Sequence, residues 1–462
     1  MSVQMQSANS GDNQGKLSLR KVAAYAGLAV GAIALVCVLV LLCFPDVFLN
    51  RFLKDRITRA QAEAYPAFSV HIAGLHCNVW ENRMTCDSVA LTTSDSTLSC
   101  TVATFSVSGI RWIHLLFGGS LAPNDLSNFV VDAQGILLNA PQSQYELRCG
   151  MLRLSVPDSE MAVEALTLHP SGDDEQFFAA SKFRKTRFRL VVPRARLMGL
   201  ECLALLQGQS YSAHSAQMND TFIDVLINKD KPSAIDTSRT LMPNEILSSM
   251  KGNLQVDSVR IMDGQLKYGE RFAVGAKPAL ITFENMRVLA EGIANHRDRY
   301  AASVIHAQGT FMKAGTMRVL MSIPVASPEF SFQYSGSLSA MDLSALNGFI
   351  EIAEQMRIKA GSLEAATFEI NVVSGRAGGT VRAKYRDLTL AVLNKQTGSD
   401  KGFLNGIASL IANRIKIRRT NEADKSGAIA VGKVKYARKQ DDPFFRFVWF
   451  ALRSGVKDVV GF

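Results

Sequence analysis

One uncharged segment near the N-terminus, residues 22–44, limits what this chain can become. Its sequence, VAAYAGLAVGAIALVCVLVLLCF, has no charged side chain. A helix needs roughly 20 apolar residues to cross a bilayer core about 30 Å thick, and a buried helix of a globular protein would normally keep a polar face. The rival interpretation is a secretory signal, which ends its shorter apolar region at a small-x-small cleavage site. Because the segment ends in Leu-Leu-Cys-Phe-Pro, we expect an uncleaved transmembrane helix.

The charges around this helix predict its orientation. Lys16, Arg20 and Lys21 precede it, whereas the basic residues that follow it are mixed with Asp46 and Asp55. A short basic N-terminal tail stays in the cytoplasm, and long domains cross the membrane largely regardless of charge. We therefore expect a disordered cytoplasmic tail over residues 1–21, an inner-membrane anchor over 22–44, and a periplasmic remainder. This location makes nucleic acid an improbable partner for the net charge of +10.

Alternating hydrophobicity dominates the chain after the anchor. Short runs such as Phe68-Val70-Ile72 and Tyr145-Leu147-Cys149 place apolar residues at every second position, between clusters of Gly, Asn, Asp and Ser. This pattern is typical of half-buried strands joined by turns. We expect a β-rich region over residues 45–340 and a mainly β fold with one long antiparallel sheet. A sheet that is apolar on one face has to cover that face with helices, another sheet or a ligand.

Residues 341–462 form a C-terminal β region that also contains amphipathic helices. The sequence predicts helices over residues 343–358, 401–414 and 444–460, with strands between 367 and 393. The last helix carries apolar side chains at helical spacing, and this stripe either packs in the core or docks on a membrane. Its members are Phe445, Val448, Trp449, Leu452 and Val456.

Five cysteines lie outside the anchor, so a fully paired disulfide framework within one chain is excluded. A two-residue turn at Glu81-Asn82 would place Cys77 directly opposite Cys86. Such a non-hydrogen-bonded pair brings Cα atoms to about 4.5 Å, which suits a cross-strand disulfide. Two reduced cysteines side by side in a core fit the same pattern.

Catalytic and cofactor motifs are absent from the sequence. The chain has no H-E-x-x-H, no phosphate-binding GxxxxGK[ST], no G-x-S-x-G and no C-x-x-C. The seven histidines are scattered, and a zinc site needs about four ligands at set spacing. We therefore expect neither an enzyme nor a bound cofactor or metal.

Four segments together resemble the bacterial AsmA-like superfamily, specifically its members related to the domain of unknown function DUF748. The order of the segments carries the resemblance, since each is mainly a spacing of apolar residues. They are the strands HIAGLHCNVWENRMTCDSVALTT after the membrane helix, residues 195–232 ending in Lys-Asp-Lys-Pro, residues 242–271 with a Val-x-Ile-x-Asp-Gly strand, and the C-terminal pair 383–394 and 445–461.

The AsmA-like superfamily is similar to bridge-like lipid transfer proteins of the bacterial envelope. The resemblance implies an inner-membrane anchor and a curved periplasmic sheet whose apolar groove binds phospholipid or another acyl lipid. It also implies a part in phospholipid transport or in the biogenesis and integrity of the outer membrane.

The alternating strands supply candidates for the groove lining, which we expect to come from one parity of each strand: Leu254, Val256, Leu388 and Leu390. The alternative is a non-catalytic scaffold or assembly factor that binds another envelope protein, or a second copy of itself, and carries no lipid. The lipid-binding hypothesis requires a groove that is left open, whereas the scaffold hypothesis requires a filled core.

Overall fold

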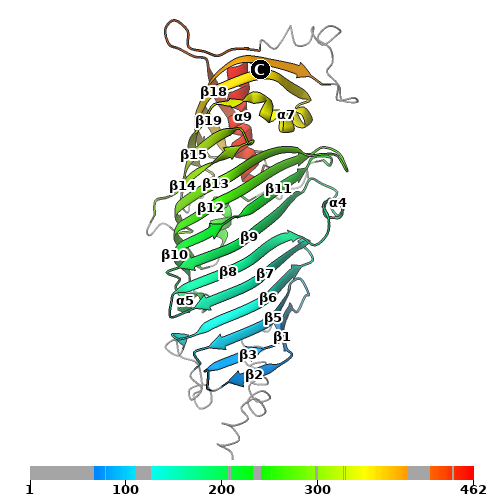
Figure 1. Cartoon of the computed structure of the whole chain (residues 1–462), viewed down its shortest axis with the longest axis vertical. Coiled ribbons are helices and arrows are strands. Elements are labelled where there is room, and N and C mark those ends of the chain that lie inside the picture. The colour runs from blue at the N-terminus through cyan, green and yellow to red at the C-terminus, as the bar shows by residue number, and fades with distance from the viewer. Residues whose placement is uncertain are drawn as a thin grey trace, which may run out of the picture.

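A computed structural model describes residues 67–461 of the chain, except 79, 111–125, 207, 209, 233–240, 251, 297–299, 326, 328, 394–416 and 440–441. Within these residues, 20 strands form a single sheet with few helices (Figure 1). This confirms the expected mainly β fold. The anchor over 22–44 and the predicted helix 401–414 lie outside the described residues. No helix in the described part is long and apolar enough to cross a membrane.

In the part of the chain that the structure describes, the first eleven strands follow one another with two short helical insertions. Their bounds are β1 Phe68–Ile72, β2 Leu75–Asn78, β3 Arg83–Cys86, β4 Val89–Thr93, β5 Ser99–Ser108, β6 Val130–Ala140, β7 Tyr145–Ser155, β8 Glu160–Pro170, β9 Thr186–Met198, β10 Ser210–Asn219 and β11 Phe222–Asn228. The insertions are α4 (Asp174–Ala179), after β8, and α5 (Cys202–Leu206), after β9.

The remaining strands are longer in the middle of the chain. Their bounds are β12 Asn253–Arg271, β13 Ala279–Ala294, β14 Ala302–Phe311, β15 Gly315–Pro324, β16 Phe332–Leu338, β17 Met341–Asp342, β18 Met356–Val373, β19 Arg376–Val392 and β20 Val431–Ala437. The helical elements are α6 Pro243–Ser249, η2 Leu343–Leu346, α7 Asn347–Ala353 and α9 Phe444–Val460.

Two of the predicted helices can be compared with these bounds. The helix expected over residues 444–460 is confirmed as α9. The helix expected over 343–358 is too long, because α7 ends at Ala353 and β18 begins at Met356. Between them, Gln355 has a φ of 56°. A left-handed residue cannot continue a right-handed helix, so the chain turns there into the strand.

Neighbouring strands pair antiparallel along most of the sheet, and three positions in it are filled by two strands placed end to end. β3 and β4 lie together beside β5, and β16 and β17 lie together beside β18. β10 and β11 both lie between β9 and β12, and their pairing with β12 is parallel. The strands cross the long axis of the molecule obliquely, so that a row of paired residues runs along its length (Figure 1).

The sheet curls around α7 and α9 at its C-terminal end. One buried cluster joins Tyr268 of β12 and Ile281 of β13 to Tyr385 of β19, although these strands are far apart in the sheet. Phe349 of α7 and Val459 of α9 belong to the same cluster. The two helices therefore fill the space that the curved sheet encloses.

Candidate functional site

The candidate site is one face of the sheet between β6 and β13, which we call the apolar face. Each of these strands except β11, which lies end to end with β10, contributes an apolar side chain to a single row of paired residues. We call it the central row; it consists of Ala133, Leu152, Val163, Ala195, Met218, Ile261 and Val288. At about 4.8 Å per strand, the row extends roughly 29 Å along the molecule.

A second apolar row runs beside the first, nearer the other ends of the strands. Its members also pair in register from strand to strand. They are Leu138, Leu147, Leu168, Leu190, Ile223 and Leu266. In most strands the two rows are an odd number of positions apart. In β7, for example, Leu147 and Cys149 belong to the half of the strand that carries the second row, and Leu152 and Leu154 belong to the half that carries the central row. Strict alternation would place Cys149 and Leu152 on opposite faces.

A line of interrupted strand pairing, which we call the crease, allows both rows to share one face. In every strand from β6 to β12 the regular ladder is interrupted at the same register position. The positions are Gly135, Gly150, Ala165, Pro193, Asp220 and Asp263. Four of them have a φ between 52° and 62°, namely Gly135, Ala165, Asp220 and Asp263. An extra left-handed residue bends a strand and shifts its side-chain phase by one position.

Small residues along the crease allow its strands to lie close together. A Cβ atom on Gly150 would stand 3.1 Å from the Cβ of Ala165, and one on Gly135 would stand 2.8 Å from that of Ala103. The crease thus folds the sheet lengthwise into two arms, and apolar residues on both arms face the same side.

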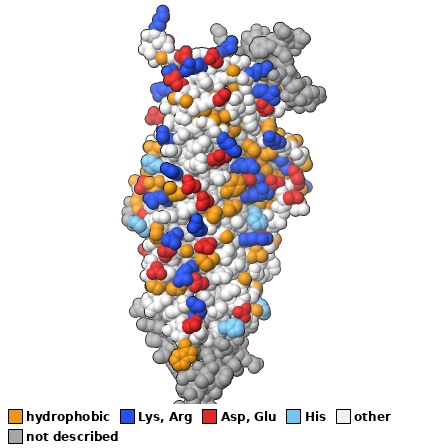
Figure 2. Space-filling view, in the orientation of Figure 1, with side chains coloured by type: hydrophobic (Ala, Val, Ile, Leu, Met, Phe, Trp, Pro, Cys, Tyr) orange, Lys and Arg blue, Asp and Glu red, His pale blue; other side chains and the backbone are white. Residues whose placement is uncertain are grey.

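The central row is left uncovered only from Ala195 to Val288, since Ala133 and Val163 are buried and Leu152 packs against the α5 cluster. Ala195, Met218, Ile261 and Val288 are only half-buried, and none of them belongs to a buried hydrophobic cluster of the described residues. The opposite face of the same strands is polar, with Arg153 paired to Asp132 at 3.1 Å. In Figure 2, basic and acidic side chains are spread over much of the described part of the face in view.

Protein does cover the apolar face elsewhere. At one rim, Cys202 and Leu205 of α5 pack with Leu154, Leu197 and Ala213. At the N-terminal end, Ile72, Leu75 and Val107 form a separate cluster with Phe105 and Val131. Towards the C-terminus, α9 packs on β16 to β20. The uncovered stretch is therefore bounded at both ends and along one rim.

A buried group of charges lies at the C-terminal boundary, between β12 and α9. Lys229 donates to Glu270 Oε2 at 2.5 Å, and the Tyr268 hydroxyl donates to Glu270 Oε1 at 2.8 Å. Burial lowers the pKa of Lys229, although the Glu270 carboxylate partly opposes this shift. Burial and the same carboxylate together raise the pKa of Tyr268 well above its usual range. Burial therefore favours the neutral hydroxyl of Tyr268, and it favours Lys229 either as a neutral amine or paired with Glu270.

The predicted lining residues fall in two different environments. Leu254 and Val256 are half-buried on β12, where Val256 pairs with Ala213 and Ile293. Leu388 is buried in the cluster that contains α7 and α9, and Leu390 packs against that cluster. The latter two residues therefore belong to the filled end of the sheet.

The expectation that one parity of each strand lines the face is wrong. Bulges shift the phase not only at Asp263 but also at Asp387, whose φ is 57° and which directly precedes Leu388. Residues on either side of such a bulge share a face despite their opposite parity.

The hairpin register predicted for the first cysteines is also wrong. Cys77 lies opposite Met84, and Cys86 lies opposite Leu75. Asn78 causes the difference, because its Oδ1 accepts from the backbone N–H groups of Trp80 and Glu81 and so holds a four-residue turn.

Cys77 and Cys86 nevertheless lie on adjacent strands in one buried cluster, and they form no disulfide in the structure. Burial raises the pKa of the Cys86 thiol, and the nearby Asp87 carboxylate raises it further. The thiol form is therefore favoured at this position.

The predicted stripe on the last helix only partly coincides with the side that faces the sheet. The fully buried residues of α9 are Phe447, Ala451 and Val459. Phe445 and Val456 are exposed, whereas Trp449 packs against Phe349 with their ring centroids 5.9 Å apart. Val448 and Leu452 are partly buried against the cluster over β16 to β20. Most of the predicted stripe thus contributes to core packing.

The comparisons with known proteins add no relative: no protein family model matches the chain, and no curated protein is similar to it in sequence. In the part of the chain that the structure covers, no three His, Cys, Asp or Glu side chains gather as ligands of a metal ion would. The apolar face is therefore interpreted from its own geometry.

Proposed function

We propose that this chain is an inner-membrane-anchored periplasmic protein that binds phospholipid or another acyl lipid on its apolar face. In this proposal it contributes to phospholipid transport or to the biogenesis and integrity of the outer membrane. The resemblance to AsmA-like proteins supplies the location and the process. The protein itself performs no catalysis and acts by shielding acyl chains from water.

The uncovered stretch of the central row, from Ala195 to Val288, is the observation that carries the proposal. Apolar surface that no protein side chain covers is costly in water, and extended patches of it usually mark a binding site. Burying acyl chains there would gain about 0.8 kcal/mol for each CH₂ group removed from water. The uncovered stretch from Ala195 to Val288 crosses four strands, or roughly 14 Å, close to the hydrocarbon thickness of one bilayer leaflet, about 15 Å. Most of one acyl chain would therefore fit along this stretch.

The crease also explains how a sheet can offer a binding surface of this shape. Regular alternation on a flat sheet would expose a plane, from which an acyl chain could leave on every side. Leu168 and Met218 lie on opposite sides of the crease, so a lipid bound along it would contact both arms. The α5 cluster and the charged group near Glu270 then mark one side and one end of the surface.

Bound lipid provides the test. The full chain is extracted with its surrounding lipid into an amphipathic polymer, and the retained lipid is quantified by mass spectrometry for the wild type and for a Met218→Asp/Ile261→Asp variant. We expect the variant to retain less phospholipid per chain, because two carboxylates in the central row disfavour acyl chains. Lipid around the anchor is common to both samples and cancels in the difference. Equal lipid in both samples would favour the scaffold hypothesis.

A further inference from the structure

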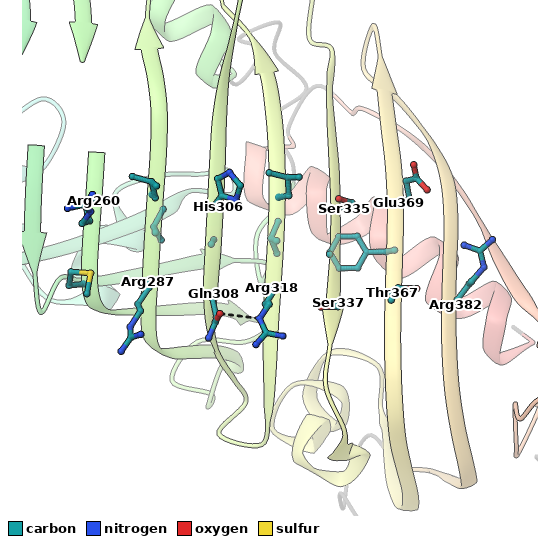
Figure 3. Close-up of a pocket in the computed structure, with 18 residues that line it drawn as sticks. Arg260, Arg287, His306, Gln308, Arg318, Ser335, Ser337, Thr367, Glu369 and Arg382 are labelled. Carbon is teal, nitrogen blue, oxygen red and sulfur yellow. Dashed lines mark hydrogen bonds between the residues drawn. The ribbon is translucent and has the colours of Figure 1, made fainter. Parts of the chain in front are cut away.

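The face opposite α9 has a hollow of about 710 Å³ over β12 to β19 (Figure 3). Two register rows form its walls. One row joins Arg260, Leu289, His306, Leu320, Ser335 and Glu369. The other joins Arg287, Gln308, Arg318, Ser337, Thr367 and Arg382.

The row between these walls turns its side chains to the apolar face, so the floor of the hollow is mainly backbone. Gly336 lies in this middle row, where a Cβ atom would stand only 2.5 Å from the ring of Phe368. Phe368 itself belongs to the cluster beneath α9. The backbone groups of the floor are already paired in ladders, so recognition by this hollow depends on the side chains of its walls.

Those side chains are mostly hydrogen-bond donors with positive charge. Four arginines line the hollow against a single carboxylate, that of Glu369. Among the residues that the structure describes, no carboxylate forms an ion pair with Arg260, Arg287, Arg318 or Arg382. Arg318 Nε donates to Gln308 Oε1 at 3.1 Å, which fixes that guanidinium beside the hollow.

We propose that this hollow binds an elongated anion that carries at least two phosphate groups. Arg287 and Arg318 lie two strands apart, which corresponds to about 10 Å. A guanidinium group binds phosphate oxygens through two parallel hydrogen bonds. Ser337 and Thr367 add hydroxyl donors between Arg318 and Arg382, and these suit the third oxygen of a phosphate. The phosphates belong either to a lipid headgroup or to a soluble polyphosphate.

An acidic polypeptide fits the hollow less well. Extended peptides usually bind a sheet by pairing with the backbone of an edge strand, whereas the strands β13, β14, β15, β16 and β18 have neighbours on both sides. The hollow is also independent of the lipid-binding proposal, because it lies on the other face of the sheet. Failure of either proposal would leave the other intact.

Calorimetric titration of the full-length protein in detergent micelles tests the site. The probes are linear inorganic polyphosphate, a short-chain water-soluble cardiolipin analogue with two phosphates in one headgroup, and polyglutamate. The test variant is Arg287→Gln/Arg318→Gln. The matched control is Arg194→Gln/Arg196→Gln, which removes the same charge from the polar side of β9, outside the hollow.

We expect at least one phosphate probe to bind, the test variant to bind it at least about tenfold more weakly, and the control to remain within about twofold. Preference between the two phosphate probes would identify the source of the ligand. Three results would overturn the site: no binding of either phosphate probe, equal weakening in both variants, which would indicate only the attraction of a net charge of +10, or equally tight binding of polyglutamate.

Discussion

Asp220, between β10 and β11, and Asp263 of the neighbouring β12 occupy the same register position, and both adopt a left-handed backbone conformation, with φ of 52° and 55°. Asp220 separates β10 from β11, which lie end to end. Asp263 shifts the alternation of side chains between the two faces within β12. Aspartate tolerates this conformation better than most residues with a side chain. The crease is therefore encoded by single residues in separate strands.

Replacing Asp263 tests whether the left-handed conformation is required. Asp263→Val should destabilise the fold by about 1–2 kcal/mol, because a β-branched side chain clashes with the backbone at positive φ. Asp263→Gly should be close to neutral, since glycine adopts this conformation freely. Urea unfolding of both variants measures the effect. Equal stability of the valine and glycine variants would show that the bulge is not fixed at this residue.

The contact between α9 and β20 depends on two glycines. A Cβ atom on Gly432 would stand 2.0 Å from the carbonyl oxygen of Gly455, so Gly432→Ala should push the helix away from the sheet. We expect a loss of about 1–3 kcal/mol in unfolding free energy, as for other overpacked sites. Gly378→Ala is the matched control on β19, because nothing lies within 4 Å of its Cβ position. Thermal unfolding of both variants measures the change in Tm. Equal changes in Tm would argue against close helix–sheet contact.

The buried pair of Lys229 and Glu270 should be costly to break. Lys229→Met leaves the Glu270 carboxylate, whose side chain is 2% exposed, without its cation. We expect a loss of about 3 kcal/mol or more, and recovery of much of it in Lys229→Met/Glu270→Met. A double-mutant cycle measured by denaturant unfolding gives the coupling. Additive losses would show that the two side chains do not interact.

The same lysine predicts a dependence of stability on pH. Burial lowers the pKa of Lys229 below its ordinary value. Between the folded and the ordinary pKa, the unfolded chain therefore binds more protons than the folded protein, and the contribution of Lys229 to stability rises with pH through that window. The stability of the Lys229→Met variant should not show this rise with pH. Unfolding free energies measured across alkaline pH test this. The same dependence on pH in the variant and the wild type would show that Lys229 is not its source.

A single charge on the apolar face should impair function without loss of protein. Met218→Asp places a carboxylate in the half-buried central row, where an acyl chain would have to pass it. We expect a weakened outer-membrane barrier at normal protein abundance, measured by entry of a large antibiotic and by immunoblotting. Gln217→Asp, on the opposite face of the same strand, should leave both unchanged. Degradation of the Met218 variant alone would instead indicate an ordinary core position.

The sequence was sufficient for the mainly β fold and for α9, since alternating strands and a helix of 17 residues are strong local signals. It was not sufficient for the register at Cys77, because a side-chain contact of Asn78 sets the turn. The sequence alone does not reveal the crease, for a related reason. A three-residue step such as Cys149 to Leu152 looks like an interrupted strand until neighbouring strands show the same step in register. The arginines of the hollow come from β12, β13, β15 and β19, so no local sequence motif identifies them as a group.

The proposed function requires lipid contact with the apolar face, and photo-crosslinking in intact cells measures that contact directly. A photoreactive amino acid is placed at Met218 in one variant of the full chain and at Gln217 in another, and crosslinked adducts are identified by mass spectrometry. We predict phospholipid adducts at Met218 and none at Gln217, because the two side chains lie on opposite faces of β10. Protein adducts without lipid at Met218, or equal lipid adducts at both positions, would contradict it.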